Sequence, residues 1–188
     1  MNPKKELRLS LKAARKETFD KYMEDPQLYY RLIRENTVSA IQSLIPENCI
    51  VAGYYTMSTE IDCNYILKEL AKTHTVALPS IQGNHLVFRE WDTKESSLVK
   101  GKFGIPEPQG NQVTPQVVLA PLLGFDDNCF RLGYGGGFYD KAFEHLEALK
   151  VGVAFSTQRV KQLPVEEFDI PLDFVITELG VSSIRNNH

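Results

Sequence analysis

The segment 124–141, GFDDNCFRLGYGGGFYDK, holds the residues best suited to do chemistry in this chain. Arg131 offers a planar guanidinium suited to phosphate, and Asp140 offers a hard oxygen ligand of the kind Mg²⁺ uses beside a nucleotide. Between them lies a glycine cluster, whose backbone reaches φ > 0 and lets a ligand approach closely. Free N–H groups in such a loop form an anion-binding concavity, and a helix N-terminus behind it adds a favourable dipole. The glycines are Gly133, Gly135, Gly136 and Gly137. Together these residues indicate ATP chemistry.

A glycine-rich loop alone is also typical of a tight strand-to-helix turn. The chain contains neither G-x-x-x-x-G-K-[ST] nor a G-x-G-x-x-G followed by a ribose-binding acid, so neither common nucleotide fingerprint applies. The preceding run 117–126, VVLAPLLGFD, predicts a buried strand. Open α/β sheets place their ligands at the carboxyl ends of such strands, which favours a binding site at this loop.

Composition limits the function classes. The chain has 188 residues and a formal net charge of −3, which argues against a general nucleic-acid binder. No apolar run approaches the roughly 20 residues that span a bilayer, and no apolar stretch follows the basic N-terminus as in a signal peptide. The cysteines, Cys49, Cys63 and Cys129, are odd in number and scattered, which fits a reducing cytosol. We therefore expect a cytoplasmic protein that binds neither nucleic acid nor membrane.

The elements that must position the loop alternate between helix and strand. Helical spacing predicts a helix from Pro3 through Leu7, Leu11 and Ala14, and a longer one from Pro26 that ends before Pro46. We further expect strands at 49–55, 75–78, 85–90, 117–126, 151–155, 174–177 and 181–184, helices at 62–71 and 137–149, and a long loop at 100–115. The alternation predicts one α/β domain over 1–188. Its three layers would be a mostly parallel, Rossmann-like sheet with helices on both faces.

At four places the residues resemble the 5-formyltetrahydrofolate cyclo-ligase family, also called the 5,10-methenyltetrahydrofolate synthetases. The glycine segment RLGYGGGFYD at 131–140, preceded by PLLGFD at 121–126, is similar to the family signature. The segment KKELR at 4–8 resembles the family's N-terminal basic helix, and YTMSTEID at 55–62 resembles its substrate-binding turn. The segment FGIPEP at 103–108 is similar to its mid-chain loop. The resemblance covers nearly the whole chain. It also implies a sheet similar to that of the sugar-phosphate isomerases and CoA-transferases.

The resemblance implies a reaction in which ATP phosphorylates the formyl oxygen of 5-formyltetrahydrofolate. N10 of the folate then attacks the activated carbon, and phosphate leaves to give 5,10-methenyltetrahydrofolate, with ADP as the other product. Such chemistry needs positioning and charge neutralisation more than covalent help from the protein. The resemblance further implies that ATP is a co-substrate, that Mg²⁺ is the cofactor and that the protein is a monomer.

The resemblance also assigns roles to individual residues. It gives catalysis to Arg131 and Asp140, and metal binding to Asp140 and Asp169. It gives ATP binding to Lys4, Lys5, Glu6, Leu7, Arg8, Arg131, Leu132, Gly133, Tyr134, Gly135, Gly136, Gly137, Phe138 and Tyr139. It gives folate binding to Arg8, Tyr55, Met57, Glu60, Phe103, Tyr134, Gly135, Gly136, Gly137 and Phe138. Some family members carry lysine where this chain has Gly136, so Arg131 or a lysine from elsewhere must supply that charge.

Several of these residues also have purely structural interpretations. Asp169 could form an Asx turn before Pro171, and Asp140 could favour the dipole of an early helical turn. Lys4 and Arg8, four residues apart on one helix face, could be a solvated basic surface, and Glu60 could be an acid near the next helix N-terminus.

Two other functions remain open at this point. One is a sugar-phosphate or CoA enzyme on a similar scaffold, because fold does not fix function. ATP-independent turnover would favour it. The other is a non-catalytic nucleotide- or folate-binding module, which would bind ATP or folate without releasing ADP.

Overall fold

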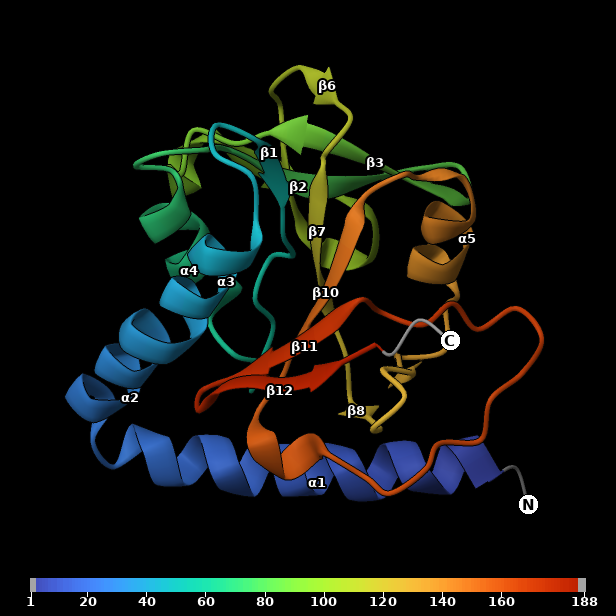
Figure 1. Cartoon of the computed structure of the whole chain (residues 1–188). Helices are drawn as coiled ribbons and strands as arrows, with labels where there is room; N and C mark the ends of the chain where they lie inside the picture. The colour runs from blue at the N-terminus through green and yellow to red at the C-terminus, as the bar shows by residue number, and fades with distance from the viewer. Residues whose placement is uncertain (1–2, 186–188) are drawn as a thin grey trace.

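An eight-stranded sheet forms the centre of the computed structural model, which describes residues 3–185 (Figure 1). Two further pairs of strands, β4 with β5 and β8 with β9, lie outside this sheet. The strands in chain order are β1 (Ile50–Ala52), β2 (Thr75–Gln82), β3 (His85–Glu90), β4 (Leu98–Lys100), β5 (Pro106–Pro108), β6 (Gln112–Val113), β7 (Val117–Pro121), β8 (Gly124–Phe125), β9 (Arg131–Leu132), β10 (Leu149–Val153), β11 (Phe174–Thr177) and β12 (Gly180–Ile184). The sheet order is β12-β11-β10-β7-β1-β2-β3-β6. Strands β11, β10, β7, β1 and β2 run parallel, whereas β12, β3 and β6 pair antiparallel with their neighbours.

Helices cover both faces of this sheet, as the alternating pattern predicted. They are α1 (Pro3–Met23), α2 (Pro26–Leu32), the π-helical η1 (Ile33–Val38), α3 (Ser39–Leu44), α4 (Cys63–Leu70) and α5 (Phe138–His145), with short 3₁₀ turns η2 (Glu95–Ser97), η3 (Lys102–Gly104) and η4 (Ser156–Gln158). In Figure 1, α2, α3 and α4 lie on one side of the sheet and α5 on the other. The three-layer α/β prediction is confirmed.

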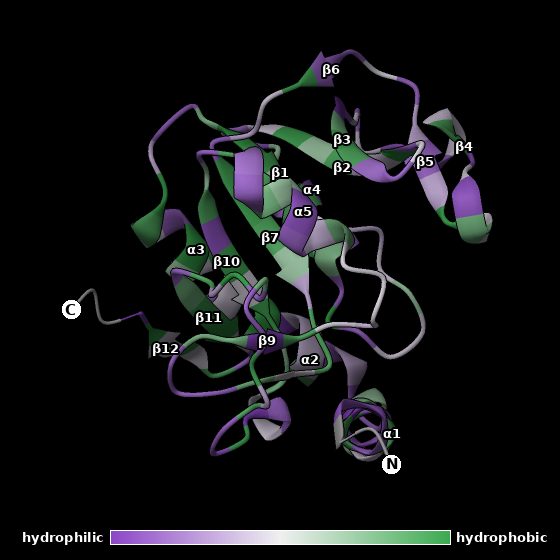
Figure 2. Cartoon of the chain, turned by 90° about the vertical axis from the view of Figure 1, so that its right-hand side faces the viewer, coloured by the Kyte–Doolittle hydropathy of each residue, from purple (hydrophilic) through white to green (hydrophobic). Residues whose placement is uncertain are grey.

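The period of two along β7 explains the layers. Val117 and Leu119 pack into the core beneath α2–α4, while Val118 and Ala120 pack into the core that includes Phe143 of α5. Such a strand is apolar on both faces. The apolar colouring of the central strands in Figure 2 shows the same pattern.

Helix α1 belongs to neither layer and runs across one end of the sheet (Figure 1). Its Leu11 joins Leu123, Leu132 and Leu163 in a third apolar cluster. Leu123 follows β7 and Leu132 lies at the start of the glycine segment, so this cluster holds α1 against the carboxyl end of the sheet. The helix is thereby placed beside the loops that follow the strands.

Several element bounds differ from the prediction, each for a local reason. The run 117–126 is two strands, because the chain turns after Pro121 and β8 pairs with β9 instead of the main sheet. Strand β1 ends at Ala52, where the turn that carries Glu60 begins, and α5 ends at His145, four residues before 149. Strand β10 begins two residues earlier than 151, and β2 extends to Gln82. The expected loop at 100–115 contains the short strands β5 and β6 and the turn η3.

Candidate active site

The candidate site lies where the direction of strand succession reverses. From β1 the chain moves outward to β2 and β3, and then returns to place β7 on the other side of β1. Open α/β sheets bind ligands in the crevice outside the carboxyl ends at such a switch point. The turn that carries Glu60 follows β1, and the glycine segment follows β7 through the β8–β9 hairpin. Two of the sequence motifs therefore meet at one edge of the sheet.

The glycine loop is an open backbone surface at the start of α5. Residues 134–137 are exposed, and Gly135 and Gly137 have φ of 99° and 65°. Gly137 is the residue that caps α5, in the left-handed region that glycine adopts without steric cost. A Cβ on Gly136 would lie 2.9 Å from the ring of Phe138. The loop thus exposes main chain next to the positive end of a helix dipole, which suits an anion.

Arg131 is more enclosed than a phosphate-binding arginine at a loop surface would be. Its side chain is 5% exposed, and its Nη2 donates to Asp140 Oδ1 at 2.7 Å. The guanidinium carbon lies 5.7 Å from the ring centre of Tyr139 and 5.6 Å from that of Phe143. Its Nε is buried and has no partner among the described residues. The two predicted catalytic residues therefore meet and form an ion pair.

Asp140 and Asp169, the two predicted metal ligands, belong to one polar cluster. The backbone N–H of Ile170, next to Asp169, lies 3.5 Å from Asp140 Oδ1. Within the described part of the chain, no group of three or more His, Cys, Asp or Glu side chains is arranged to hold a metal. Two carboxylates leave most of a Mg²⁺ coordination sphere to water and phosphate oxygens, which is how Mg²⁺ is commonly held beside nucleotides. The donor set fits that role.

Lys4 joins this cluster from the first turn of α1. Its Nζ lies 2.8 Å from Asp169 Oδ2 and 3.1 Å from Glu166 Oε2. Burial by itself would raise the pKa of Asp169. The hydrogen bonds from Lys4 and from the Glu166 N–H, together with the charges of Lys4 and Arg131, outweigh burial and lower this pKa below its usual range. Asp169 Oδ2 also accepts the backbone N–H of Glu166 at 2.8 Å, which closes a local turn on the N-terminal side of Asp169 and not toward Pro171.

Arg8 supplies positive charge at the glycine loop itself. Its Nε donates to the carbonyl of Gly133 at 2.9 Å, and its guanidinium carbon lies 3.5 Å from the position that a Cβ on Gly135 would occupy. Because Arg131 is enclosed, the cations that α1 brings to the glycine loop and the Asp169 cluster are Arg8 and Lys4. Lys5 and Glu6 are exposed on the same helix.

Two predicted ATP-binding residues are also core residues. Leu7 packs against the third apolar cluster, and Leu132 is 3% exposed within it. Any contact of Leu132 with a ligand would therefore come from its backbone.

Glu60 is a buried carboxylate at the inner end of its turn. It is 6% exposed, its Oε2 accepts the backbone N–H of Met57 at 2.8 Å, and its Oε1 accepts the hydroxyl of Tyr134. Burial raises the pKa of Glu60, while the hydrogen bonds from Tyr134 and Met57 and the charge of Arg15 oppose that rise. A buried, oriented carboxylate of this kind suits a planar ligand that offers two adjacent N–H donors.

Arg15 is a site residue that the sequence interpretation missed. Its side chain is 2% exposed and contacts Thr59, Glu60 and Tyr134. One signal was available: Arg15 follows Arg8 by seven residues, two helical turns, and so projects from nearly the same face of α1. Among the many basic residues of this helix that spacing did not stand out.

Of the predicted apolar walls, Phe103, Tyr134 and Met57 lie at the glycine loop and the Glu60 turn, whereas Tyr55 packs against the core beneath α2–α4. Phe103 is 69% exposed with φ of 59°, and its ring centre lies 6.3 Å from that of Phe138. Tyr134 is 51% exposed although its hydroxyl donates to the buried Glu60, and Met57 is 42% exposed. Tyr55 is half-buried and donates to Glu95 Oε2 at 3.1 Å. Exposed aromatic faces beside a polar anchor suit a flat heterocycle.

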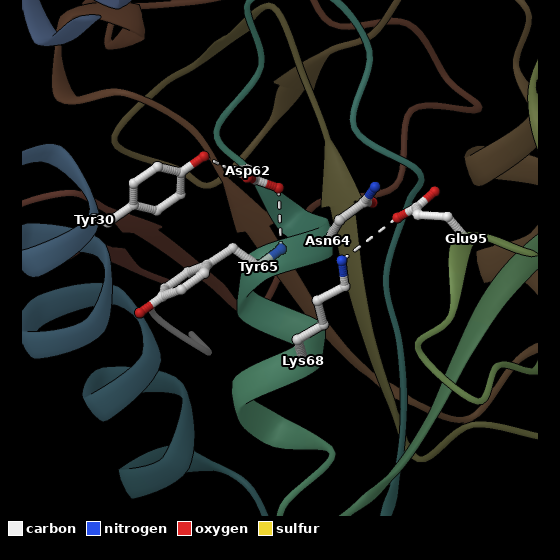
Figure 3. Close-up of a pocket in the computed structure, with 6 residues that line it drawn as sticks. All are labelled: Tyr30, Asp62, Asn64, Tyr65, Lys68 and Glu95. Carbon is white, nitrogen blue, oxygen red and sulfur yellow. Dashed lines mark hydrogen bonds and ion pairs between the residues drawn. The ribbon is translucent and has the colours of Figure 1, made fainter. Parts of the chain in front are cut away.

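A separate cleft of about 400 Å³ lies between α2 and α4 (Figure 3). It is lined by Tyr30, Asp62, Asn64, Tyr65, Lys68 and Glu95. Its polar groups largely satisfy one another, since Tyr30 donates to Asp62 at 3.0 Å and Lys68 Nζ lies 3.5 Å from Glu95 Oε1. None of the residues predicted for ATP, folate or metal lines it. The chemistry suggested by the motifs lies at the glycine loop instead.

Comparison with known proteins shows what this chain is similar to. Within residues 3–185, no helix is both long and apolar enough to cross a membrane. The 5-formyltetrahydrofolate cyclo-ligase of Escherichia coli K12 is 34% identical over 140 residues, covering 68% of this chain and 76% of that protein. The NMR structure of Aquifex aeolicus 5,10-methenyltetrahydrofolate synthetase matches with a TM-score of 0.77 and 30% identity, over 98% of this chain and 94% of that one.

A more distant structure shares the fold. The 5,10-methenyltetrahydrofolate synthetase of Mycoplasma pneumoniae matches with a TM-score of 0.63 at 20% identity, over 88% of this chain and 96% of that one. The sequence model of the 5-formyltetrahydrofolate cyclo-ligase family matches residues 1–178. This chain is therefore an enzyme of the 5-formyltetrahydrofolate cyclo-ligase family.

Proposed function

We propose that this enzyme converts 5-formyltetrahydrofolate to 5,10-methenyltetrahydrofolate with consumption of ATP and dependence on Mg²⁺. The observation that carries the proposal is the meeting of two motifs at the switch point. Glu60, on the turn after β1, and the glycine loop, after β7, are joined there through the hydroxyl of Tyr134. The first suits the N–H edge of a pterin and the second suits phosphate, so the two substrates would bind side by side.

The chemistry requires the formyl oxygen to become a leaving group. Transfer of the γ-phosphoryl group of ATP to that oxygen releases ADP, and attack by N10 on the same carbon closes the ring and expels phosphate. The loop N–H groups, with Arg8 and Lys4 beside them, would hold the phosphates and neutralise their charge. The protein need not supply a nucleophile, because N10 is part of the substrate, and the proton that N10 loses on ring closure leaves to the departing phosphate or to water.

Mg²⁺ would be held by Asp140 and Asp169. When bound beside ATP, the ion supplies charge neutralisation at the phosphate oxygens. The carboxylates now face Arg131 and Lys4, so binding of a cation would release these side chains toward the phosphate side. We further propose that residues 1–188 act as one cyclo-ligase domain and as a monomer, because one sheet edge supplies all of the residues named here.

An absorbance assay tests the proposal. Purified protein is mixed with 5-formyltetrahydrofolate, Mg²⁺ and ATP, and the methenyl chromophore is followed with ADP release measured in parallel. We expect ATP-dependent product that disappears when Mg²⁺ is chelated. Product without ATP would favour an ATP-independent enzyme on a similar scaffold. Binding of ATP or folate without ADP release would favour a non-catalytic module.

A further inference from the structure

Arg15 is a fully enclosed arginine in the middle of an amphipathic helix. Its side chain is 2% exposed, whereas Lys12 and Lys16 on either side of it are exposed. Arginine is almost never fully buried unless its charge is paired and its donors are bound. The partners of Arg15 therefore indicate why the charge is there.

These partners come from two segments that are distant in sequence. The Nε of Arg15 donates to Thr59 Oγ1 at 3.2 Å, on the turn after β1. Its Nη1 donates to the hydroxyl of Tyr134, in the glycine loop after β7, and lies 3.7 Å from Glu60 Oε1. The Tyr134 hydroxyl in turn donates to Glu60. One guanidinium thus joins α1, the Glu60 turn and the glycine loop.

The geometry uses the fork of an arginine. Separate nitrogens of one planar group reach Thr59 and the Tyr134–Glu60 pair, and the guanidinium carbon also lies 5.7 Å from the centre of the Tyr134 ring. A lysine would supply the charge from a single point and could not hold both segments in this arrangement.

We propose that Arg15 is a positioning residue that holds Glu60 as an ionised and oriented acceptor for the folate and fixes it to the glycine loop through Tyr134. This inference rests on the proposed function, since it concerns the folate side of that site. It adds a residue that would touch neither substrate and would act through two that do.

The charges around Glu60 agree with this role. Burial raises the pKa of Glu60, and Arg15 is the cation among the groups that lower it. The other titratable groups that interact with Glu60 are Tyr134 in the glycine loop, Tyr54 after β1, Cys63 at the start of α4 and Tyr139 in α5. Burial raises the pKa of each of these groups, so all four are neutral near pH 7. Without Arg15 the rise in the pKa of Glu60 would be less opposed.

The test measures binding of 5-formyltetrahydrofolate by calorimetry in the absence of ATP, from pH 6 to pH 9. The variants are Arg15→Gln, Arg15→Lys and Tyr134→Phe, and Lys16→Gln is the matched control on the same helix. We expect Arg15→Gln to weaken folate binding about 10-fold or more at pH 7, with partial recovery as the pH rises and Glu60 ionises. Arg15→Lys should bind better than Arg15→Gln at pH 6 because it keeps the charge. Lys16→Gln should bind like wild type.

A purely structural arginine would give another pattern. Equal loss at every pH for Arg15→Gln, with no advantage for Arg15→Lys, would overturn the proposal, as would wild-type affinity in Arg15→Gln. If Arg15→Gln does not fold, Tyr134→Phe decides, because its half-exposed ring can stay while the hydroxyl that joins loop and Glu60 is lost. We expect 3- to 10-fold weaker folate binding from it, and unchanged affinity would overturn the proposal.

Failure of the proposed function would look different. A wild-type protein that neither binds 5-formyltetrahydrofolate nor forms the methenyl product would contradict that function, and the role of Arg15 with it. A wild-type protein that turns over normally beside unaffected variants would contradict the role of Arg15 alone.

Discussion

Arg131 Nη2 and Asp140 Oδ1 carry opposite charges and lie 2.7 Å apart. A close arginine–carboxylate pair holds both side chains in a fixed position. A metal ion that competes for Asp140 and a phosphate that competes for Arg131 would together replace this pair without leaving a charge unpaired. The ion pair therefore prepares both residues for the roles proposed for them.

Replacement of Asp140 by asparagine should separate catalysis from folding. Asparagine keeps an oxygen that can accept from Arg131, so the loss of stability should be about 1 kcal/mol, or a few degrees in Tm. Loss of the charge at the proposed metal position should lower kcat by about 100-fold or more. Turnover at varied Mg²⁺ and a thermal melt measure the two effects. Wild-type kcat with unchanged Mg²⁺ dependence would remove Asp140 from the metal site.

The Lys4–Asp169 pair should make stability depend on pH in one direction. The pKa of Asp169 is lower in the folded chain than in the unfolded chain. Its stabilisation is therefore fully present above the unfolded pKa near 4 and is lost as pH falls through the folded pKa. Urea unfolding of wild type and Asp169→Asn should differ by about 0.5–1 kcal/mol at pH 7 and converge in strong acid.

The control for this pair is Glu166→Gln. Its side chain is 72% exposed although it lies 3.1 Å from Lys4, so we expect a smaller effect than for Asp169→Asn. A difference between wild type and Asp169→Asn that grows as the pH falls would contradict the assigned direction of the pKa shift.

At this scale the sequence could indicate residue types but not their partners. The glycines, Arg131 and Asp140 are marked by an unusual local pattern, and they do meet. That Arg131 would be enclosed by Tyr139 and Phe143 depends on how α5 packs, which no local pattern specifies. Arg15 and Tyr134 could not be joined to Glu60 from the sequence, because Arg15 lies 44 positions before Thr59, the neighbour of Glu60, and 119 positions before Tyr134.

Helix α1 is the element that brings the site together. Over its length it supplies Lys4 to Asp169, Arg8 to the glycine loop and Arg15 to the Glu60 turn. Its register on the sheet is set by Leu11, whose Cδ1 lies 2.5 Å from where a Cβ on Gly124 would be. Glycine at 124 thus permits the close approach of helix and strand.

Substitution of Gly124 by alanine should therefore move α1. The added methyl group cannot fit beside Leu11 without a shift, and overpacking of this kind costs about 1–3 kcal/mol. Because the shift displaces Lys4 and Arg8, the KM for ATP should also rise. In a double-mutant cycle, Leu11→Ala should relieve part of the penalty, with a coupling of about 1 kcal/mol. Strict additivity would show that α1 does not bear on Gly124 in solution.

The hydrophobic periodicity of the sequence predicted which helices and strands form better than it predicted where each one begins and ends. The long helical pattern after Pro26 is correct, yet six of its residues, Ile33–Val38, form a π-helix. This wider turn lets Asn36 donate to the Glu178 carbonyl at 2.8 Å and Thr37 to the Thr177 carbonyl at 2.9 Å, across to the β11–β12 hairpin. Such a turn is fixed by tertiary contacts rather than by local propensity.

At the scale of the whole molecule, the strand order explains why two unrelated motifs share one site. Strands β1 and β7 are neighbours in the sheet, although 64 residues lie between the end of β1 at Ala52 and the start of β7 at Val117. The alternating pattern predicted a parallel sheet, and the rule for ligand position predicted its carboxyl edge. Which strands would flank the switch point depends on sheet order, which the sequence alone did not determine.

This arrangement predicts that the two substrates bind cooperatively. The glycine loop would hold the nucleotide and Glu60 the folate, and Tyr134 is bonded to Glu60 from within that loop. A ligand that orders the loop would place the hydroxyl of Tyr134 for the other site, so each ligand should tighten the other by the same factor. With ADP or a non-hydrolysable ATP analogue and Mg²⁺ present, we expect folate to bind about 5-fold or more tightly, within the usual range of such coupling.

Calorimetric titration in both orders measures this coupling without turnover. Folate must raise the affinity for nucleotide by the same factor by which nucleotide raises the affinity for folate. Agreement between the two factors is an internal check on the measurement. Tyr134→Phe keeps the ring and loses the link, so it should lower the coupling factor more than it lowers nucleotide affinity itself. Independent binding in the wild type would mean that the shared sheet edge holds both ligands without linking them. Coupling retained in Tyr134→Phe would instead place the link in direct contact between the substrates.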